Sequence, residues 1–296
     1  MNRYLHHTLL LALLLMSCQQ GKQENKPPGE TTIGEGTVKP ALSIDLLKQY
    51  DFSHPSEVIK LPKELKEVSG IRFINDSMLV MISDSKPDIF FYNIRQQAIV
   101  KQIRVGSRGD FEDIAVSGDR IFVIQSNGVL WTVGQYNESP TLTADSLPLQ
   151  QPFEIEGLST NEKGDSLFLA AKYWHQDDLV PSGMLPVWGW SLSEKKRSEK
   201  PILLVPDKVS SSKGQQEFHT SGILPVYPEG RWLLISTNNK FIVQMNTAGQ
   251  VDTLIKLDED VFVKPEGIAF SPDGNLFISN EGKYDKATLL AFKKIN

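Results

Sequence analysis

The sequence predicts an all-β protein, a β-propeller built from four-stranded blades. The first observation is a repeat, because the stretch KPEGIAFSPDGNLFISNE at residues 264–281 has partial copies at four earlier places. The second is the spacing: the anchor residues of the five copies lie at positions 69, 112, 156, 221 and 266. A near-constant step of this kind indicates a repeat architecture. The third is composition, since short runs of Val, Ile and aromatic residues alternate with turns of Asn, Asp and Gly, as in antiparallel strands.

Each unit contains the same elements in the same order. First strands are predicted at residues 70–74, 114–116, 158–160, 223–226 and 268–270. Second strands, each with a polar end, are predicted at residues 78–82, 121–124, 167–171, 232–235 and 276–278. Third strands follow at residues 89–94, 129–133, 187–192, 241–245 and 288–292, and weaker fourth strands at residues 99–105, 141–147, 201–205 and 251–257.

The last unit stops after three strands, and residues 57–61 supply the missing one. Placing this N-terminal strand in the C-terminal blade closes the ring and removes an open sheet edge. Five blades are favoured, and six are possible if residues 173–216 hide a degenerate blade. An insertion is preferred there, because residues 173–185 read as a long loop and a single third strand and fourth strand follow it.

The N-terminus predicts a lipoprotein signal peptide at residues 1–17. Arg3 precedes an apolar run at residues 8–16 that is too short to span a bilayer, and residues 15–18 match the bacterial lipobox. Cys18, the single cysteine, is therefore the predicted lipidation site and would anchor the protein to a membrane. Residues 18–40 are polar and predict a flexible tether, which leaves residues 41–296 for the propeller.

The net charge of the chain indicates which partners it can bind, and the residue after Cys18 indicates its membrane. The formal net charge is -5 and no extended basic cluster is present, which argues against nucleic-acid binding. We expect a monomer in the bacterial cell envelope. Gln19 is not the aspartate that retains many lipoproteins in the inner membrane, so the outer membrane is favoured over the periplasmic face of the inner membrane.

The anchor positions predict a polar ring at one mouth of the central channel. Residues two apart on a strand point the same way, so each anchor forms a matched pair with the residue two positions before it. The ten residues of these pairs are Glu67, Ser69, Asp110, Glu112, Glu154, Glu156, His219, Ser221, Lys264 and Glu266. Six of them are carboxylates, which would repel one another in a desolvated funnel unless they bind protons or a cation.

We therefore expect a cation site made of Glu112, Glu156 and Glu266. The predicted ligand-binding set adds Glu67, His219, Asn127, Asn238 and Asn280. Oxygen ligands suit Ca²⁺ or another hard divalent cation better than zinc. In the alternative interpretation the acidic residues cap the blade ends by accepting hydrogen bonds from backbone N–H groups.

Three further features have functional and structural interpretations. His219 beside Ser221 is a weak nucleophile signal, because no G-x-S-x-G motif surrounds either residue. The insertion at residues 172–178 forms either a lid over the mouth or a variable surface loop in which Trp174 packs on a neighbour. Trp188 and Trp190 lie in a predicted strand and are expected in the core.

The ordered motifs resemble the SdiA-regulated family of bacterial propellers. They are EVSGI at residues 67–71, DFEDIA at 110–115, EIEGL at 154–158 and KPEGIAFSPDG at 264–274, and the resemblance covers residues 56–296. It implies a cell-envelope propeller of five blades without a settled activity. More distantly, the motifs resemble NHL-repeat, gluconolactonase and strictosidine-synthase-like propellers. The fourth unit, HTSG at residues 219–222, departs from the acidic pattern, so a full ring of equivalent ligands is not expected.

Three functions follow as expectations. The leading one is a lipid-anchored envelope protein that binds a small ligand or divalent cation at the channel mouth. The second is a Ca²⁺-dependent hydrolase of the lactonase, esterase or phytase-like type. The third is a protein interaction platform. The fold by itself does not choose among them.

Overall fold

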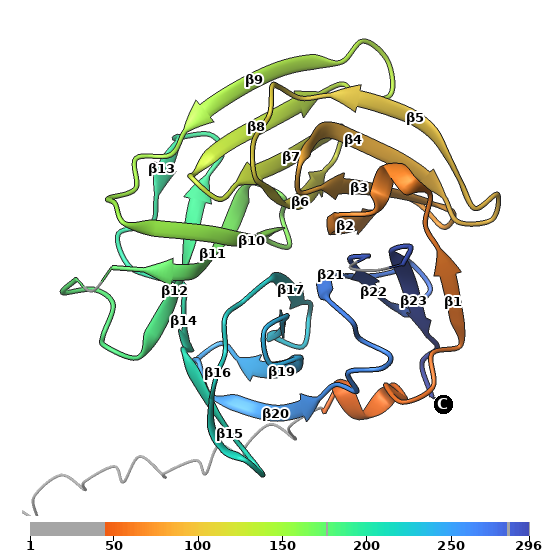
Figure 1. Cartoon of the computed structure of the whole chain (residues 1–296). Coiled ribbons are helices and arrows are strands. Elements are labelled where there is room, and N and C mark those ends of the chain that lie inside the picture. The colour runs from red at the N-terminus through yellow and green to blue at the C-terminus, as the bar shows by residue number, and fades with distance from the viewer. Residues whose placement is uncertain (1–44, 176, 283–284, 296) are drawn as a thin grey trace, which may run out of the picture. The chain divides into compact units, whose positions relative to one another are not determined.

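The computed structural model describes residues 45–175, 177–282 and 285–295. They form five antiparallel blades around a central channel, as predicted (Figure 1). The predicted signal peptide, the lipidation site Cys18 and the tether lie outside the described residues. Two 3₁₀ helices occur within the described part, η1 (Leu47–Gln49) and η2 (Lys63–Leu65). No helix there is long and apolar enough to cross a membrane.

The strands follow the predicted order, and each blade begins with its innermost strand. The first blade contains β2 (Val68–Phe73), β3 (Met78–Ser83), β4 (Lys86–Asn93) and β5 (Ala98–Arg104). The second contains β6 (Phe111–Ser117), β7 (Arg120–Gln125), β8 (Val129–Gly134) and β9 (Thr141–Ser146). The fourth contains β17 (Gly222–Val226), β18 (Arg231–Ser236), β19 (Phe241–Asn246) and β20 (Val251–Lys256).

The fifth blade contains the closure predicted from the sequence. It consists of β21 (Pro265–Phe270), β22 (Leu276–Asn280), β23 (Thr288–Phe292) and the N-terminal strand β1 (Glu57–Lys60). β1 pairs antiparallel with β23, with Ile59 opposite Leu289. The outer edge of the last sheet is therefore formed by the first strand of the chain, which joins the two ends of the propeller.

The third blade departs from the regular pattern. It contains β10 (Phe153–Thr160), β11 (Ser166–Trp174) and β12 (Met184–Ser191), followed by an outer strand in two pieces, β13 (Lys196–Arg197) and β14 (Leu203–Pro206), which both pair with β12. A separate hairpin follows, β15 (Lys208–Ser211) and β16 (Gly214–Glu217). This hairpin and the residues between β11 and β12 account for the long repeat. A two-stranded hairpin is not a sixth blade, and the expected loop is shorter than residues 173–185 because β11 continues through Trp174.

The innermost strands form a closed ring and explain the glycine of the repeat. β2 packs beside β6, β6 beside β10, β10 beside β17, β17 beside β21, and β21 beside β2. A Cβ atom on Gly267 would lie 2.5 Å from the Ser69 carbonyl oxygen, and one on Gly222 would lie 2.5 Å from the Glu266 carbonyl oxygen. Glycine is needed at these positions because neighbouring strands approach one another there.

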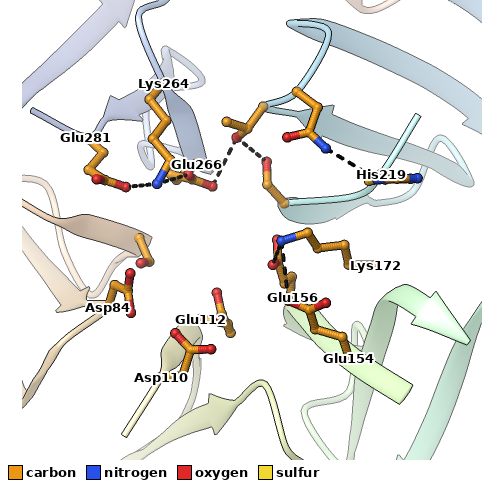
Figure 2. Close-up of a pocket in the computed structure, with 14 residues that line it drawn as sticks. Asp84, Asp110, Glu112, Glu154, Glu156, Lys172, His219, Lys264, Glu266 and Glu281 are labelled. Atoms are coloured by element: carbon orange, nitrogen blue, oxygen red, sulfur yellow. Dashed lines mark hydrogen bonds and ion pairs between the residues drawn. The ribbon is translucent and has the colours of Figure 1, made fainter. Parts of the chain in front are cut away.

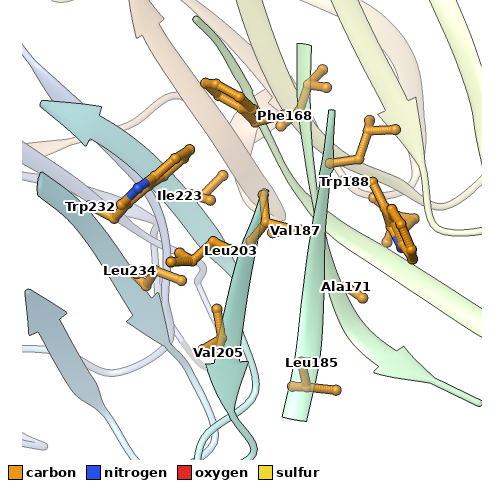
Figure 3. Close-up of a cluster of buried hydrophobic side chains, with 14 of the residues drawn as sticks. Phe168, Ala171, Leu185, Val187, Trp188, Leu203, Val205, Ile223, Trp232 and Leu234 are labelled. Atoms are coloured by element: carbon orange, nitrogen blue, oxygen red, sulfur yellow. The ribbon is translucent and has the colours of Figure 1, made fainter. Parts of the chain in front are cut away.

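The hydrophobic core lies between adjacent blades. Four clusters of buried side chains fill the spaces between neighbouring sheets. Figure 3 shows the cluster between the third and fourth blades, where Val187 and Leu203 face Ile223 and Leu234. Trp188 is fully buried and Trp190 is 4% exposed, which confirms their predicted place in the core. Packing on both faces of each blade holds the innermost strands, and with them the channel mouth, in fixed positions.

Candidate functional site at the channel mouth

A polar cavity of about 160 Å³ opens at one end of the channel (Figure 2). It lies where the innermost strands begin and the second strands end, so both predicted sources of side chains line it. Its lining residues are Ser69, Asp84, Asp110, Glu112, Glu154, Glu156, Lys172, His219, Ser221, Thr237, Asn238, Lys264, Glu266 and Glu281. Nine of the ten paired anchor residues are among them, and Glu67 is not.

The strand register explains this convergence. In the third blade a bulge in β10 lies beside Glu156, and the β10–β11 register leaves Lys172 without a partner between Ala171 and Tyr173. A bulge of this kind re-aims side chains at the rim of a sheet. Similar irregularities occur at the starts of β2, β6 and β21. The same local distortion thus brings anchor residues of four blades toward one opening.

Two lysines are held by two carboxylates each. Lys172 Nζ donates to Glu156 and lies 3.3 Å from Glu154 Oε1. Lys264 Nζ donates to Glu281 and lies 3.4 Å from Glu266 Oε1. Glu156 and Glu266 occupy equivalent anchor positions, so the third and fifth blades repeat one arrangement, an ammonium group between two carboxylates. Neighbouring carboxylates raise the pKa of both lysines against the opposing effect of burial, and both remain charged at neutral pH.

Three other carboxylates, Asp84, Asp110 and Glu112, have no such partner. We call Ser69, Asp84, Asp110 and Glu112 the acidic corner; among the described residues, none of its three carboxylates forms an ion pair with a lysine or arginine. A backbone hydrogen bond of 2.9 Å from Phe111 N to the Asp84 carbonyl oxygen joins its two blades. Figure 2 shows the three carboxylates together along one side of the cavity.

Protonation is divided unequally within the acidic corner. Burial, reinforced by the charges of Glu156, Asp110 and Asp84, raises the pKa of Glu112 to about 10. Burial and the hydrogen bond with Asp110 raise the pKa of Asp84 to about 7. Burial acts against the charged form of Asp110, but hydrogen bonds with Asp84, Ser126 and Glu112 outweigh it and lower its pKa. Asp110 is therefore the ionised member at neutral pH, and Glu112 carries a proton.

The paired glutamates are also shifted toward the protonated form. Burial raises the pKa of Glu156 to about 8 even though Lys172 acts in the opposite direction. Burial likewise raises the pKa of Glu266 to about 7 against the effects of Lys264 and Thr237. Carboxylates crowded into a desolvated cavity repel one another, and bound protons remove part of their negative charge, as expected from the sequence.

The fourth blade supplies the uncharged wall of the cavity. The Thr237 hydroxyl donates to Glu266 Oε2 at 3.0 Å, and the Ser221 hydroxyl lies 3.3 Å from the Pro265 carbonyl oxygen. The Asn238 amide lies 3.3 Å from His219 Nδ1. His219 and Ser221 therefore have separate partners and do not bond to each other as a nucleophile and base would.

Three members of the predicted ligand set lie away from the cavity. The Glu67 carboxylate accepts a hydrogen bond from the Ser85 hydroxyl. Asn127 accepts one from Val129 N in an exposed turn. Asn280 is 3% exposed and donates to the Val261 carbonyl oxygen at 2.9 Å. The other five members line the cavity, because the strands that carry or adjoin them begin or end at its rim. They are Glu112, Glu156, His219, Asn238 and Glu266.

The predicted cation ligands fit a metal only after rearrangement. Their oxygen atoms suit a hard cation such as Ca²⁺. Glu156 and Glu266 already hold lysine ammonium groups, so an ion bound jointly by Glu112, Glu156 and Glu266 would have to displace both lysines. In the part of the chain that the structure describes, no three His, Cys, Asp or Glu side chains form a metal-ligating group.

The segment at residues 172–178 contributes one residue to the cavity, Lys172, which lies in β11. Trp174 packs against Phe153 and Trp188, as in the structural interpretation of this segment. Tyr173 is 52% exposed and does not line the cavity. Within the described residues, this segment lies beside the opening and does not cover it.

A buried arginine that the sequence analysis did not single out lies among the innermost strands, and we call this part of the channel the floor. Arg72 lies in β2 and donates hydrogen bonds to the carbonyl oxygens of Ile71, Leu158, Ile223 and Ile268, which belong to four innermost strands. From the fifth strand, β6, Asp113 Oδ2 lies 3.3 Å from the guanidinium group. Arg72 lines a second cavity at the opposite ends of these strands and does not line the cavity at the mouth.

Two departures from the repeat could have revealed this floor. In the second unit Asp113 replaces the glycine that follows the anchor, and Arg72 is the sole charged residue two positions after that glycine or its equivalent. Asp113 is 1% exposed, and its carboxylate also accepts the backbone N–H groups of Ile114 and Leu158. Burial raises its pKa to about 6, although Arg72 and these bonds act in the opposite direction.

Comparison with known proteins supports the fold and nothing finer. No protein-family model matches the chain, and no curated protein matches its sequence. The structure is similar to the glutaminyl cyclase of Myxococcus xanthus, with a TM-score of 0.57 and 14% identity over 82% of this chain and 97% of that one. It also matches streptogramin B lyase, with a TM-score of 0.49 and 13% identity over 80% of this chain and 97% of that one.

Proposed function

We propose that the protein binds a small, positively charged ligand at the channel mouth. The observation that supports this is the lining of the cavity: seven carboxyl groups, some of them protonated in the absence of a ligand, face two lysines that are each already held by two of them. The acidic corner is thus left with carboxylates that a cation would stabilise. A divalent ion such as Ca²⁺, as expected from the sequence, is one candidate ligand.

The cellular setting of this proposal comes from the sequence. The lipobox and Cys18 support a lipid-anchored protein of the cell envelope, with the tether at residues 18–40 carrying the propeller away from the membrane surface. The motifs that resemble the SdiA-regulated family agree with this location. The outer membrane is the favoured site, because Gln19 follows the lipidated cysteine.

Titration calorimetry on the purified full-length protein tests the binding proposal. The ligand panel contains Ca²⁺, Mg²⁺, Mn²⁺ and small organic cations, and Asp110→Asn serves as the variant with one charge removed. We expect saturable binding by at least one cation and a weakened or lost signal in the variant. An absence of heat and of any change in melting temperature with every cation would refute the proposal and favour an interaction platform.

A hydrolase is the second candidate, favoured by the unequal protonation of Asp110 and Glu112. An ionised carboxylate beside a protonated one supplies a base and an acid in one cavity at neutral pH. Lactone, aryl ester and phosphoester panels test it, with a peptide bearing an N-terminal glutamine added because one protein of similar fold is a glutaminyl cyclase. Turnover abolished by Glu112→Gln would support an enzyme, and an inert protein would leave cation binding as the function.

A further inference from the structure

The cavity contains two sites at which a lysine ammonium group lies between carboxylates, and a third, similar position that has no lysine. In the third blade Lys172 lies between Glu154 and Glu156, two residues apart on β10. In the second blade Asp110 and Glu112 occupy the equivalent positions, Asp110 just before β6 and Glu112 on it. In the second blade no lysine occupies the position of Lys172. β7 ends at Gln125, and the hydroxyl of the next residue, Ser126, donates to Asp110 at 2.9 Å. The two blades thus share a pair of acidic residues but differ in the cation.

A buried hydroxyl adds an observation independent of the acidic residues. Ser69 occupies the anchor position of the first blade, is 7% exposed and lines the same cavity. Among the described residues no hydrogen bond to its hydroxyl is formed, whereas its backbone carbonyl accepts one from Ser279. The hydroxyl of this largely buried residue is therefore left for water or a bound molecule in the cavity to satisfy.

We propose that the primary ammonium group of a small organic amine occupies the acidic corner, bound by Ser69, Asp84, Asp110 and Glu112. This inference rests on the proposed function and names the chemical class of its ligand. An ammonium group has three N–H donors and no acceptor, so it can donate to the Ser69 hydroxyl and to two of the three carboxyl groups of the corner at once. Lys172 and Lys264 show that the same cavity binds this group in the same way, because each ammonium bridges two carboxylates.

The rest of the ligand is limited by the size and polarity of the cavity. A volume of about 160 Å³ is close to that of an engineered cavity that holds benzene, which limits the enclosed part to about six non-hydrogen atoms. Thr237 and Asn238 of the fourth blade line the same cavity as the acidic corner and provide uncharged polar groups. An amine that also carries a hydroxyl or amide group fits this lining better than a purely apolar amine.

Competition between matched probes tests the proposal on the full-length protein. Ethanolamine carries one primary ammonium group and putrescine carries two, whereas tetramethylammonium carries the same single charge as ethanolamine without an N–H donor. We expect the primary amines to bind at least about tenfold more tightly than tetramethylammonium by calorimetry. Equal affinity for the three probes would overturn the inference, because charge without hydrogen bonding would then suffice.

Variants locate the amine within the cavity. Ser69→Ala and Asp110→Asn should each weaken ethanolamine binding by about fivefold or more, whereas Glu67→Gln, an acidic residue that does not line the cavity, should weaken it by less than twofold. Circular dichroism and melting temperature verify that each variant is folded. A loss of affinity in Glu67→Gln alone would place the ligand elsewhere and contradict the inference.

A parallel titration with divalent ions distinguishes a failure of this inference from a failure of the proposed function on which it rests. If Ca²⁺ binds and no primary amine does, the inference fails and cation binding at the mouth stands. If no cation of either kind binds, both fail. If ethanolamine binds and Ca²⁺ does not, the amine is the ligand class of the site.

Discussion

At the scale of single residues, Arg72 connects all five blades. Its guanidinium group donates to carbonyl oxygens of four innermost strands and lies beside the Asp113 carboxylate of β6. Because both residues are more than nine-tenths buried, their charges are stabilised by each other and by these hydrogen bonds. The pair joins the innermost strands of the five blades.

Removing this arginine should destabilise the whole domain. We expect Arg72→Met to lower the free energy of unfolding in urea by about 3 to 5 kcal/mol, because a buried carboxylate and four carbonyl groups lose their donor. Arg120→Met is the matched control: Arg120 packs over the Phe122 ring at 5.3 Å, and its loss should cost about 1 kcal/mol or less.

A double variant separates the ion pair from simple packing. Asp113→Gly restores the glycine of the other units, so Arg72→Met combined with Asp113→Gly should be more stable than Arg72→Met alone. A double variant whose loss equals the sum of the two single losses would mean that the two side chains are not coupled.

At the scale of elements, the strand β1 fastens the ring. It supplies the outer edge of the fifth blade through its pairing with β23. Ile59 is the buried residue of β1 at 2% exposed, whereas the neighbouring Val58 is 53% exposed. The strand is therefore fixed to the core through Ile59.

Neighbouring substitutions in β1 measure this contribution. We expect Ile59→Ala to lower the free energy of unfolding by about 2 to 5 kcal/mol, as at other buried aliphatic positions. Val58→Ala should change it by no more than about 0.5 kcal/mol. Urea denaturation gives both values, and hydrogen exchange of the β23 amides reports whether the edge opens. Similar small effects at both positions would mean that the ring is stable without its closing strand.

The third blade shows where the prediction of elements was incomplete. Its long repeat was correctly interpreted as an insertion, but the split outer strand and the hairpin of β15 and β16 were not predicted. Residues 208–217 are mostly polar, with Ser, Lys and Gln, and their composition resembles a loop. The pairing of Val209 with Gln216 forms the hairpin, and the burial of Val209 fixes one of its faces, contacts that composition does not reveal.

At the scale of the whole molecule, the folded protein holds protons that the unfolded chain releases. Burial and crowding raise the pKa of Asp84 and Glu266 to about 7, of Glu156 to about 8 and of Glu112 to about 10. In an unfolded chain such carboxyl groups titrate near pH 4. Between these values the folded state binds more protons than the unfolded state, so its stability falls as the pH rises.

The pH dependence of unfolding should follow this sign. We expect the free energy of unfolding to be larger at pH 5 than at pH 8, measured by urea denaturation at constant ionic strength. Glu112→Gln replaces the protonated carboxyl with a neutral amide and should make this fall with pH shallower. A stability that increases from pH 5 to pH 8 would show that the channel-mouth carboxylates are ionised and balanced in the folded protein.

The sequence alone determined the repeat, the strand order, the closing strand and the blade ends that meet at the mouth. These follow from local patterns, because strand residues and turn residues recur along the chain at a similar spacing in every unit but the third. It also placed Glu112, Glu156 and Glu266 at equivalent positions around one opening.

The tertiary structure decided which of these charges pair. Lys172 and Lys264 bind the glutamates of the third and fifth blades, Asp84 joins Asp110 and Glu112 in the acidic corner, and Arg72 meets Asp113 at the floor. Lys172 pairs within its own blade, but Arg72 contacts strands as far as 196 residues away in sequence. Such pairing depends on how closely the blades approach and on side-chain reach, and no local pattern encodes these distances.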